Sequence, residues 1–191
     1  MTDPDELRRA LVAVADALDA VSPRWAVGGS LASAAHGEPR ATNDVDVVAV
    51  LDPASARRFA TLLGTDFYAD PDAAAAAARS HGSFNVIDQR SFIKIDVFVP
   101  DAGPLGSGQL DRVQRLDLLA TGRELPVLGP EDVVLQKLRW YKLGGETSDR
   151  QWRDIQSVLE TAASELDDAY LDATAAATGL LPLLQRARGA R

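Results

Sequence analysis

The 191-residue sequence contains no cysteine. This absence excludes disulfide bonds, zinc–thiolate sites and a thiol nucleophile. No uninterrupted apolar run approaches the roughly 20 residues that a membrane-spanning helix needs. Residues 1–6 are mostly polar and acidic, without the apolar stretch of a secretory signal peptide. These absences predict a cytoplasmic protein that does not contact a membrane.

Positive charge is also scarce. Lysine and arginine total 20 against 28 aspartates and glutamates, which gives a net charge of -8 and a pI of about 4.7. This balance argues against sequence-independent DNA binding, which needs a broad basic surface. It does not exclude a local basic groove. Only three of the cations are lysines. Scarce lysine beside abundant alanine and arginine is typical of a GC-rich bacterial genome.

The most informative stretch begins with Val27, Gly28, Gly29 and Ser30. Glycines let a backbone approach a ligand closely, and Ser30 opens a predicted short helix. The free N–H groups of a helix N-terminus, with a hydroxyl beside them, form a ready phosphate site. A Gly-Gly-Ser sequence alone is usually an ordinary turn, so its meaning depends on the segment that follows.

That segment carries two carboxylates on one predicted strand. Asp44 and Asp46 share a face because successive strand side chains alternate, while Val45 and Val47 point the other way. A solvated edge would explain such a pair, but the apolar run 47–51 indicates a buried strand, which is a poor place for unpaired acids. A divalent cation resolves the repulsion, and oxygen ligands suit Mg²⁺ or Mn²⁺.

A third acid interrupts another apolar strand. Residues 92–99 contain Asp96, with Lys94 on the same face. Residues 83–88 precede this strand across a short turn, which predicts a hairpin, and we expect it to be antiparallel in part to the strand of Asp44. Farther on, residues 112–118 and 124–127 fit two short strands, although residues 110–119 also fit a helix. Three acids on two apolar strands are explained together by a shared metal site.

The order of these motifs resembles the nucleotidyltransferase superfamily, which has the DNA polymerase β-like fold. The resemblance covers residues 24–99 and implies an α/β (α+β) fold with a mixed sheet flanked by helices, followed by a C-terminal helical part. Residues 130–138 and 150–155 are similar to the helical half of AbiEii-type nucleotidyltransferases, which include toxins of type IV toxin–antitoxin systems. The expected division is a catalytic domain at 1–128 and a helical domain at 129–191.

The resemblance implies a Mg²⁺- or Mn²⁺-dependent enzyme that moves a nucleoside monophosphate from a nucleoside triphosphate such as ATP to a hydroxyl acceptor, with release of pyrophosphate. The acids would serve catalysis and metal binding, and the Gly-Gly-Ser turn and three basic residues would bind the nucleotide. The implied catalytic and metal-binding residues are Asp44, Asp46 and Asp96, and the implied nucleotide-binding residues are Gly28, Gly29, Ser30, Arg40, Lys137 and Arg153.

The sequence does not identify the molecule whose hydroxyl group accepts the nucleoside monophosphate. RNA, especially a tRNA 3′ end, follows from the toxin resemblance and from the charge-balanced segment 131–154. A small molecule such as an aminoglycoside, or a protein side chain, fits the acidic composition better. The same acids would also be present in a catalytically degenerate nucleotide-binding protein held by a cognate antitoxin, although a dead site has no need for three buried acids. A purely structural domain would require the acids to pair with cations such as Arg40 and Lys94.

Overall fold

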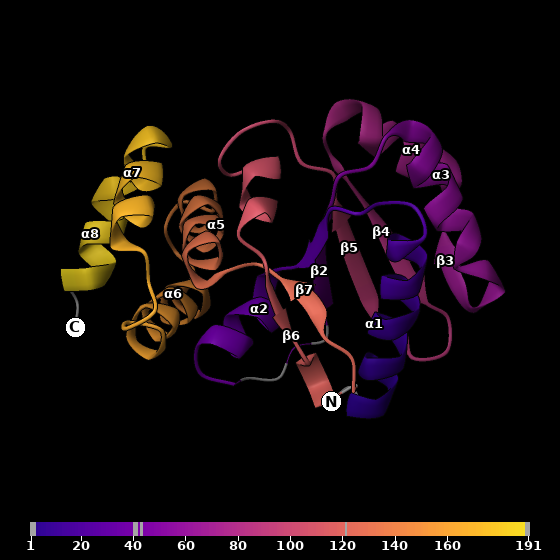
Figure 1. Cartoon of the computed structure of the whole chain (residues 1–191), viewed down its shortest axis with the longest axis horizontal. Helices are drawn as coiled ribbons and strands as arrows, with labels where there is room; N and C mark the ends of the chain where they lie inside the picture. The colour runs from indigo at the N-terminus through magenta and orange to yellow at the C-terminus, as the bar shows by residue number, and fades with distance from the viewer. Residues whose placement is uncertain (1–2, 40–41, 43, 121, 190–191) are drawn as a thin grey trace.

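The computed structural model describes residues 3–39, 42, 44–120 and 122–189. Within these residues seven strands form one mixed sheet in the order β3-β4-β5-β2-β1-β7-β6, with helices around it (Figure 1). The predicted α/β fold is confirmed. The strands are β1 (Trp25–Val27), β2 (Asp44–Ala49), β3 (Phe67–Ala69), β4 (Ser83–Asp88), β5 (Lys94–Phe98), β6 (Gln114–Leu116) and β7 (Leu125–Val127).

The helices begin where the sequence supplies capping groups. A side-chain oxygen of Asp3, Asp52, Asp70, Ser148 or Asp167 accepts a backbone N–H of the first turn in five of them, and a proline in the first turn strengthens several starts. The helices are α1 (Pro4–Asp19), α2 (Gly29–His36), α3 (Pro53–Leu62), α4 (Pro71–Ser80), α5 (Pro130–Leu143), α6 (Asp149–Thr161), α7 (Asp168–Ala177) and α8 (Leu181–Gly189), with short 3₁₀ turns η1 (Gly64–Asp66), η2 (Ser107–Asp111) and η3 (Leu118–Ala120).

Strands β4 and β5 form the predicted antiparallel hairpin, but β5 runs parallel to β2. The expectation of an antiparallel pairing between the strands of Asp44 and Asp96 was therefore wrong. After β2 the chain passes through α3, β3 and α4 before β4, and β4 takes the far side of β5. The hairpin thus returns β5 to β2 in the same direction, because an intervening crossover lets two strands run parallel.

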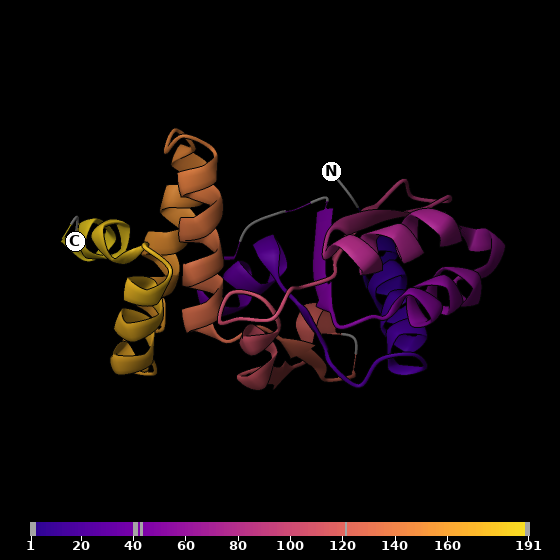
Figure 2. The same cartoon turned by 90° about the horizontal axis from the view of Figure 1, so that it is seen from above.

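The two faces of the β2–β5 pair differ sharply. On one face Val45, Val47, Ile95 and Val97 are fully buried in the hydrophobic core. The other face carries the acids. Figure 2 shows α1, α3 and α4 on one side of β2, and α2 with the C-terminal helices on the other. The alternation of side chains along each strand therefore separates core from site.

The region between β5 and α5 adds the remaining strands. β7 lies parallel to β1 and pairs antiparallel with β6, so the sheet extends beyond β1 on this side. The two short strands expected here are present, and the alternative helix over residues 110–119 is not formed. Leu125 and Val127 are fully buried, which explains why so short a strand is held in the sheet.

The four C-terminal helices gather at one end of the molecule (Figure 2, orange to yellow). α5 and α6 pack against each other and against α2, and α7 and α8 pack on their outer side. No helix in the described ranges is both long and apolar enough to cross a bilayer.

A buried acid joins α5 to α7. Asp132 is fully buried, and the Tyr170 hydroxyl donates to its Oδ1 at 2.8 Å. Its Oδ2 has no hydrogen-bond partner among the described residues. Burial raises the pKa of Asp132 from 3.8 to about 7. The effect of burial is larger than the lowering of the pKa by the Tyr170 hydrogen bond and the charge of Arg112. The acid is therefore protonated in the folded protein under mildly acidic conditions.

We expect Asp132→Asn to stabilise the protein near neutral pH. A folded-state pKa above the unfolded value means that the folded protein binds the extra proton between pH 3.8 and about 7, so wild-type stability falls as pH rises through this window. The asparagine has no charge to bury. Thermal unfolding at about pH 8 should show a melting temperature at least about 3 °C above wild type, with a smaller difference at about pH 5. The exposed Asp66→Asn is the control, and a pH-independent effect of Asp132→Asn would contradict the assignment.

Candidate active site

The Gly-Gly-Ser turn is built directly against Asp46. The Gly28 N–H donates to the Asp46 carbonyl at 2.9 Å, and the Ser30 backbone N–H donates to the Asp46 carboxylate. Gly29 opens α2 with a φ of 55°. A Cβ on Gly29 would lie 1.7 Å from Asp46 Oδ2. This position therefore requires glycine both for its left-handed backbone and for the space that the carboxylate occupies.

Parallel pairing puts the acids side by side. Asp46 is the register partner of Asp96, and Asp44 is the partner of Lys94. Asp44 is exposed at the start of β2, whereas Asp46 and Asp96 are partly buried. Burial is the largest cause that raises the pKa of Asp46, followed by the charge of Asp96; Lys137 and the Ser30 N–H lower it. Two adjacent carboxylates in a half-buried site create a demand for positive charge.

Lys94 meets part of this demand. Its Nζ lies 2.7 Å from Asp96 Oδ2. The hydrogen bond to Asp96 is the largest cause that raises the pKa of Lys94, and the charges of Asp96, Asp44 and Asp46 raise it further. Lys94 is therefore a charged ammonium on the acidic face.

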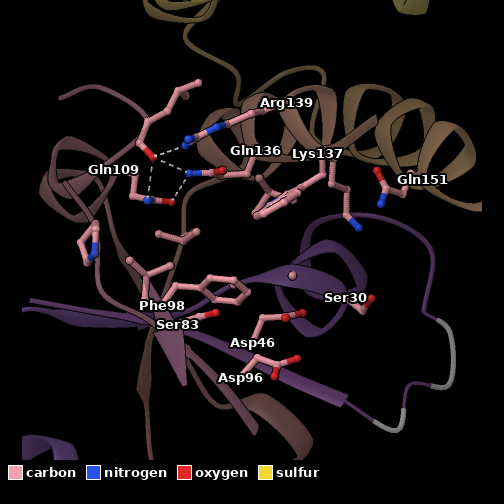
Figure 3. Close-up of a pocket in the computed structure, with 18 of the residues that line it drawn as sticks. Ser30, Asp46, Ser83, Asp96, Phe98, Gln109, Gln136, Lys137, Arg139 and Gln151 are labelled. Atoms are coloured by element: carbon pink, nitrogen blue, oxygen red, sulfur yellow. Dashed lines mark hydrogen bonds between the residues drawn. The ribbon is translucent and has the colours of Figure 1, made fainter. Parts of the chain in front are cut away.

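The acids open into a cavity of about 710 Å³ between the sheet and the C-terminal helices. Figure 3 shows Asp46 and Asp96 pointing into it from the sheet, Ser30 beside them, and Lys137 reaching toward them from α5. Lys137 is 8% exposed, and its Nζ donates to Asp154 Oδ2 on α6 at 2.8 Å. This pair fixes the ammonium at the roof of the cavity, where its charge acts on Asp46.

Most of the sequence-predicted site residues meet in this one place. Arg153 is exposed and lies outside the cavity lining, whereas Arg150, one turn earlier on α6, lies within it. Arg40 lies outside the described residues. The predicted residues that line the cavity together are Gly28, Gly29, Ser30, Asp44, Asp46, Asp96 and Lys137.

Sequence reasoning missed the helical wall of the cavity. Gln136 and Arg139 on α5 and Gln109 in η2 all donate to the Leu105 carbonyl (Figure 3, dashed lines). Gln136 and Arg139 are spaced i, i+3, so helical periodicity could have grouped them on one face. The position of Gln109 depends on the loop conformation, which no local sequence pattern indicates.

The cavity also contains an aromatic pair. The rings of Phe98 on β5 and Trp140 on α5 have centroids 6.2 Å apart and are tilted by 52°. Trp140 is 48% exposed, so much of its ring is open to a ligand. Tyr141 and Trp152, the other aromatic residues of this helix pair, instead stack on each other with centroids 5.0 Å apart. Phe98 follows Asp96 by two positions, which puts the aromatic pair next to the acids.

The two histidines have structural roles that the sequence did not reveal. His36 is buried, and its Nε2 lies 2.8 Å from the Leu128 carbonyl. A carbonyl only accepts, so Nε2 carries the proton. His81 is exposed, lines the cavity, and has its Nδ1 2.9 Å from the Pro100 carbonyl.

The donor set fits a hard divalent cation. Asp44, Asp46 and Asp96 are carboxylates on one face of adjacent strands, and such oxygen ligands suit Mg²⁺ and Mn²⁺. In the described part of the chain no three acidic or histidine side chains are already drawn together as a metal-binding group. Lys94 holds Asp96 in this arrangement. Metal binding by all three acids would therefore require a change of side-chain position.

We expect Gly29→Ala to destabilise the protein and to displace the Asp46 carboxylate. The backbone conformation costs an alanine about 1–2 kcal/mol, and the contact at 1.7 Å adds overpacking. Gly64→Ala is the matched control, because Gly64 has a similar φ of 64° but a Cβ on it would meet nothing within 4 Å. Urea unfolding should show a loss for Gly29→Ala that exceeds the control by more than about 1 kcal/mol. Equal losses would show that the space is not limiting.

No protein-family model and no curated protein sequence matches the chain. Solved structures do match it. The solution structure of the antibiotic-resistance factor ANT(2'')-Ia aligns with a TM-score of 0.62 and 12% identity over 99% of this chain and 100% of the other. An antigenic nucleotidyltransferase-like protein from Paracoccidioides brasiliensis aligns with a TM-score of 0.55 and 20% identity over 98% and 93%.

A protein from Thermotoga maritima, described as a candidate nucleotidyltransferase, aligns with a TM-score of 0.52 and 19% identity over 81% of this chain and 96% of its own. At such low identities the likeness concerns the fold. The closer similarity to AbiEii-type enzymes stays a prediction. The sheet, its order of motifs and these structural neighbours together show that the chain has the nucleotidyltransferase fold.

Proposed function

We propose that this chain is a metal-dependent nucleotidyltransferase, which moves a nucleoside monophosphate from a nucleoside triphosphate to a hydroxyl acceptor. The observation that carries the proposal is the pairing of Asp46 with Asp96 on neighbouring parallel strands, directly against the Gly28–Gly29 turn and inside a cavity. A structural domain gains nothing from two adjacent half-buried acids, whereas phosphoryl chemistry uses them.

Asp44, Asp46 and Asp96 would hold Mg²⁺ or Mn²⁺. When bound, the metal supplies positive charge that stabilises the attacking and leaving oxygens of the transferred group. The support for this role is the raised pKa of Asp46, whose causes include the charges of both other acids. Their mutual repulsion is the quantity that a divalent cation would relieve.

The triphosphate would bind between the turn and the helical wall. Gly28, Gly29 and Ser30 line the cavity at the N-terminus of α2, and a helix N-terminus favours an anion. Lys137, oriented by Asp154, and Arg150 supply positive charge from the opposite side. The sequence resemblance also implies Arg40 and Arg153 as nucleotide-binding residues, and we keep them as part of the proposal.

In the transfer step the acceptor hydroxyl oxygen attacks the α-phosphorus and forms the new P–O bond. The bond from this phosphorus to the bridging oxygen breaks, and pyrophosphate leaves with that electron pair. As the alternative to holding a metal ion, the Asp96 carboxylate would accept the hydroxyl proton. Asp96 suits this role because its side chain is only 18% exposed and points into the cavity beside Asp46. Binding both reactants in one cavity provides most of the remaining rate enhancement by orientation.

The acceptor that best fits the cavity is a small hydroxylated molecule. The volume of about 710 Å³ lies within the range of small-molecule sites. The Phe98–Trp140 pair and the glutamines of the helical wall offer stacking and hydrogen bonds next to the acids. The likeness to an antibiotic-resistance factor over the whole chain points the same way.

For either acceptor, we propose a catalytic domain at 1–128 and a helical domain at 129–191. The boundary falls between the end of β7 at Val127 and the start of α5 at Pro130.

An RNA acceptor, with a toxin role and an antitoxin partner, is the second candidate. The net charge of -8 disfavours a long nucleic acid. Three cations of the helical part are also engaged in ion pairs, Lys137 with Asp154, Arg186 with Glu146, and Arg188 with Asp168 and Asp172.

We expect nucleotide binding to depend on metal. Calorimetric titration with ATP, GTP, CTP and UTP, each with and without Mg²⁺, should show one preferred nucleotide whose binding requires the metal. The double variant Asp44→Asn, Asp46→Asn should lose most of that binding, because neutral amides replace two of the three carboxylates that would hold the metal. Equal binding by wild type and variant would place the nucleotide elsewhere.

We expect Asp46→Asn to lower turnover at least about a hundredfold, the scale of losing a key electrostatic stabiliser. Pyrophosphate release is the measurement, with the preferred nucleotide and a panel of hydroxylated small molecules and a tRNA as acceptors. Circular dichroism should show an intact fold, since Asp46 is not part of the apolar core. The exposed Asp72→Asn on α4 controls for loss of one acid. Unchanged turnover of Asp46→Asn would refute the mechanism.

A further inference from the structure

Lys94 is a cation that lies directly beside the three proposed metal ligands. It lies on β5 two residues before Asp96 and next to Asp44 in the register of β2 and β5. Its side chain therefore emerges on the acidic face, and its Nζ reaches Asp96 Oδ2 at 2.7 Å. The charges of Asp44, Asp46 and Asp96 all act on this ammonium. One cation thus interacts with the three acids that would bind the metal.

The other lysine near the acids is placed differently. Lys137 is buried, and its Nζ is held by Asp154 at 2.8 Å on the opposite wall of the cavity. The side chain of Lys94 is 43% exposed, whereas that of Asp96 is 18% exposed. A lysine ammonium on a flexible four-carbon stem can swing into solvent at small cost, while the acid stays in the site. Lys94 is therefore able to leave, and Asp96 is not.

A divalent cation and this ammonium make conflicting demands. Asp96 Oδ2 already accepts from Lys94, and two cations at one carboxylate repel each other. A metal ion therefore has to displace the ammonium before it can use all three acids.

We propose that Lys94 is a built-in counter-ion that competes with the divalent metal for Asp96. The inference rests on the proposed function, since it assumes that these acids bind the metal. In the empty protein Lys94 offsets the repulsion among the acids and stabilises the β2–β5 pair. During loading its ammonium leaves Asp96 and stays on the same face, where the anionic triphosphate would bind. Lys94 thereby weakens the binding of metal alone and favours loading of metal together with nucleotide.

The test measures metal binding without any turnover. Mn²⁺ alone is titrated by calorimetry into the full chain, and thermal unfolding is recorded in chelator and in Mn²⁺. Lys94→Gln should bind Mn²⁺ about fivefold more tightly than wild type, the scale of removing one partly exposed charge pair. In chelator it should melt about 2 °C lower, because the acids then repel each other without their counter-ion. Mn²⁺ should therefore raise its melting temperature more than that of wild type.

Two control variants separate charge at this position from loss of charge in general. Lys94→Arg keeps the cation and should stay close to wild type in both measurements. Arg57→Gln removes a cation that pairs with Asp72, between α3 and α4, and should not change Mn²⁺ affinity.

The outcomes are distinct. Tighter Mn²⁺ binding together with lower stability in chelator supports the proposal, as does a Lys94→Gln variant that folds only with Mn²⁺. Equal or weaker Mn²⁺ binding by Lys94→Gln, when wild type binds it, overturns the counter-ion role and leaves the proposed function standing. A variant that folds in neither condition also overturns the role, because Lys94 would then serve the fold irrespective of metal. Absence of Mn²⁺ binding in every variant rejects the metal site itself, and the proposed function with it.

Discussion

The repulsion between Asp46 and Asp96 is the constraint on which the site depends. Parallel pairing of β2 with β5 makes these acids register partners at the edge of a cavity. Like charges at neighbouring strand positions destabilise a sheet unless another group offsets them. Three groups offset the repulsion between the two carboxylates. Lys94 contacts Asp96, and Lys137 and the Ser30 N–H act on Asp46. The site is thus an arrangement of compensating charges, and a metal ion at the proposed site would add to it.

The apolar side of the same strands makes this arrangement possible. Val45, Val47, Ile95 and Val97 are fully buried, so a slip of one position would expose the valines and bury the acids. Such a slip is very costly, and the core therefore fixes the register of the acids. The left-handed backbone of Gly29 then brings the start of α2 against Asp46. Core packing and active-site geometry are consequences of one register.

Two acids with raised pKa values show how surroundings decide a role. Burial is the first cause for both Asp46 and Asp132. Asp46 faces a cavity, with Lys137 and the Ser30 N–H nearby, so a ligand can reach its carboxylate. Asp132 lies between α5 and α7 with the Tyr170 hydroxyl as its donor, and it has no access to solvent. A perturbed carboxyl group indicates function only where a ligand can reach it.

The sequence by itself determined the local elements of the site. Alternation along residues 44–51 and 92–99 predicted that Asp44, Asp46 and Asp96 lie opposite a buried face. Gly28 and Gly29 predicted the turn before α2. These features depend on neighbours in the chain, so a periodic pattern reveals them. Capping is likewise local, since the Ser148 side chain accepts from the Gln151 N–H three residues later at the start of α6.

Only the tertiary structure decided how these elements meet. The direction of β5 against β2 depends on the path of the chain through α3, β3, α4 and β4, which no local pattern encodes. The burial of His36, the inclusion of Arg150 in the cavity and the pairing of Phe98 with Trp140 depend on packing of the helical part against the sheet. The contact of Lys94 with Asp96 also required the three-dimensional structure, because residues two apart on a strand share a face without having to touch. Long-range packing selects among arrangements that local preferences leave equally favourable.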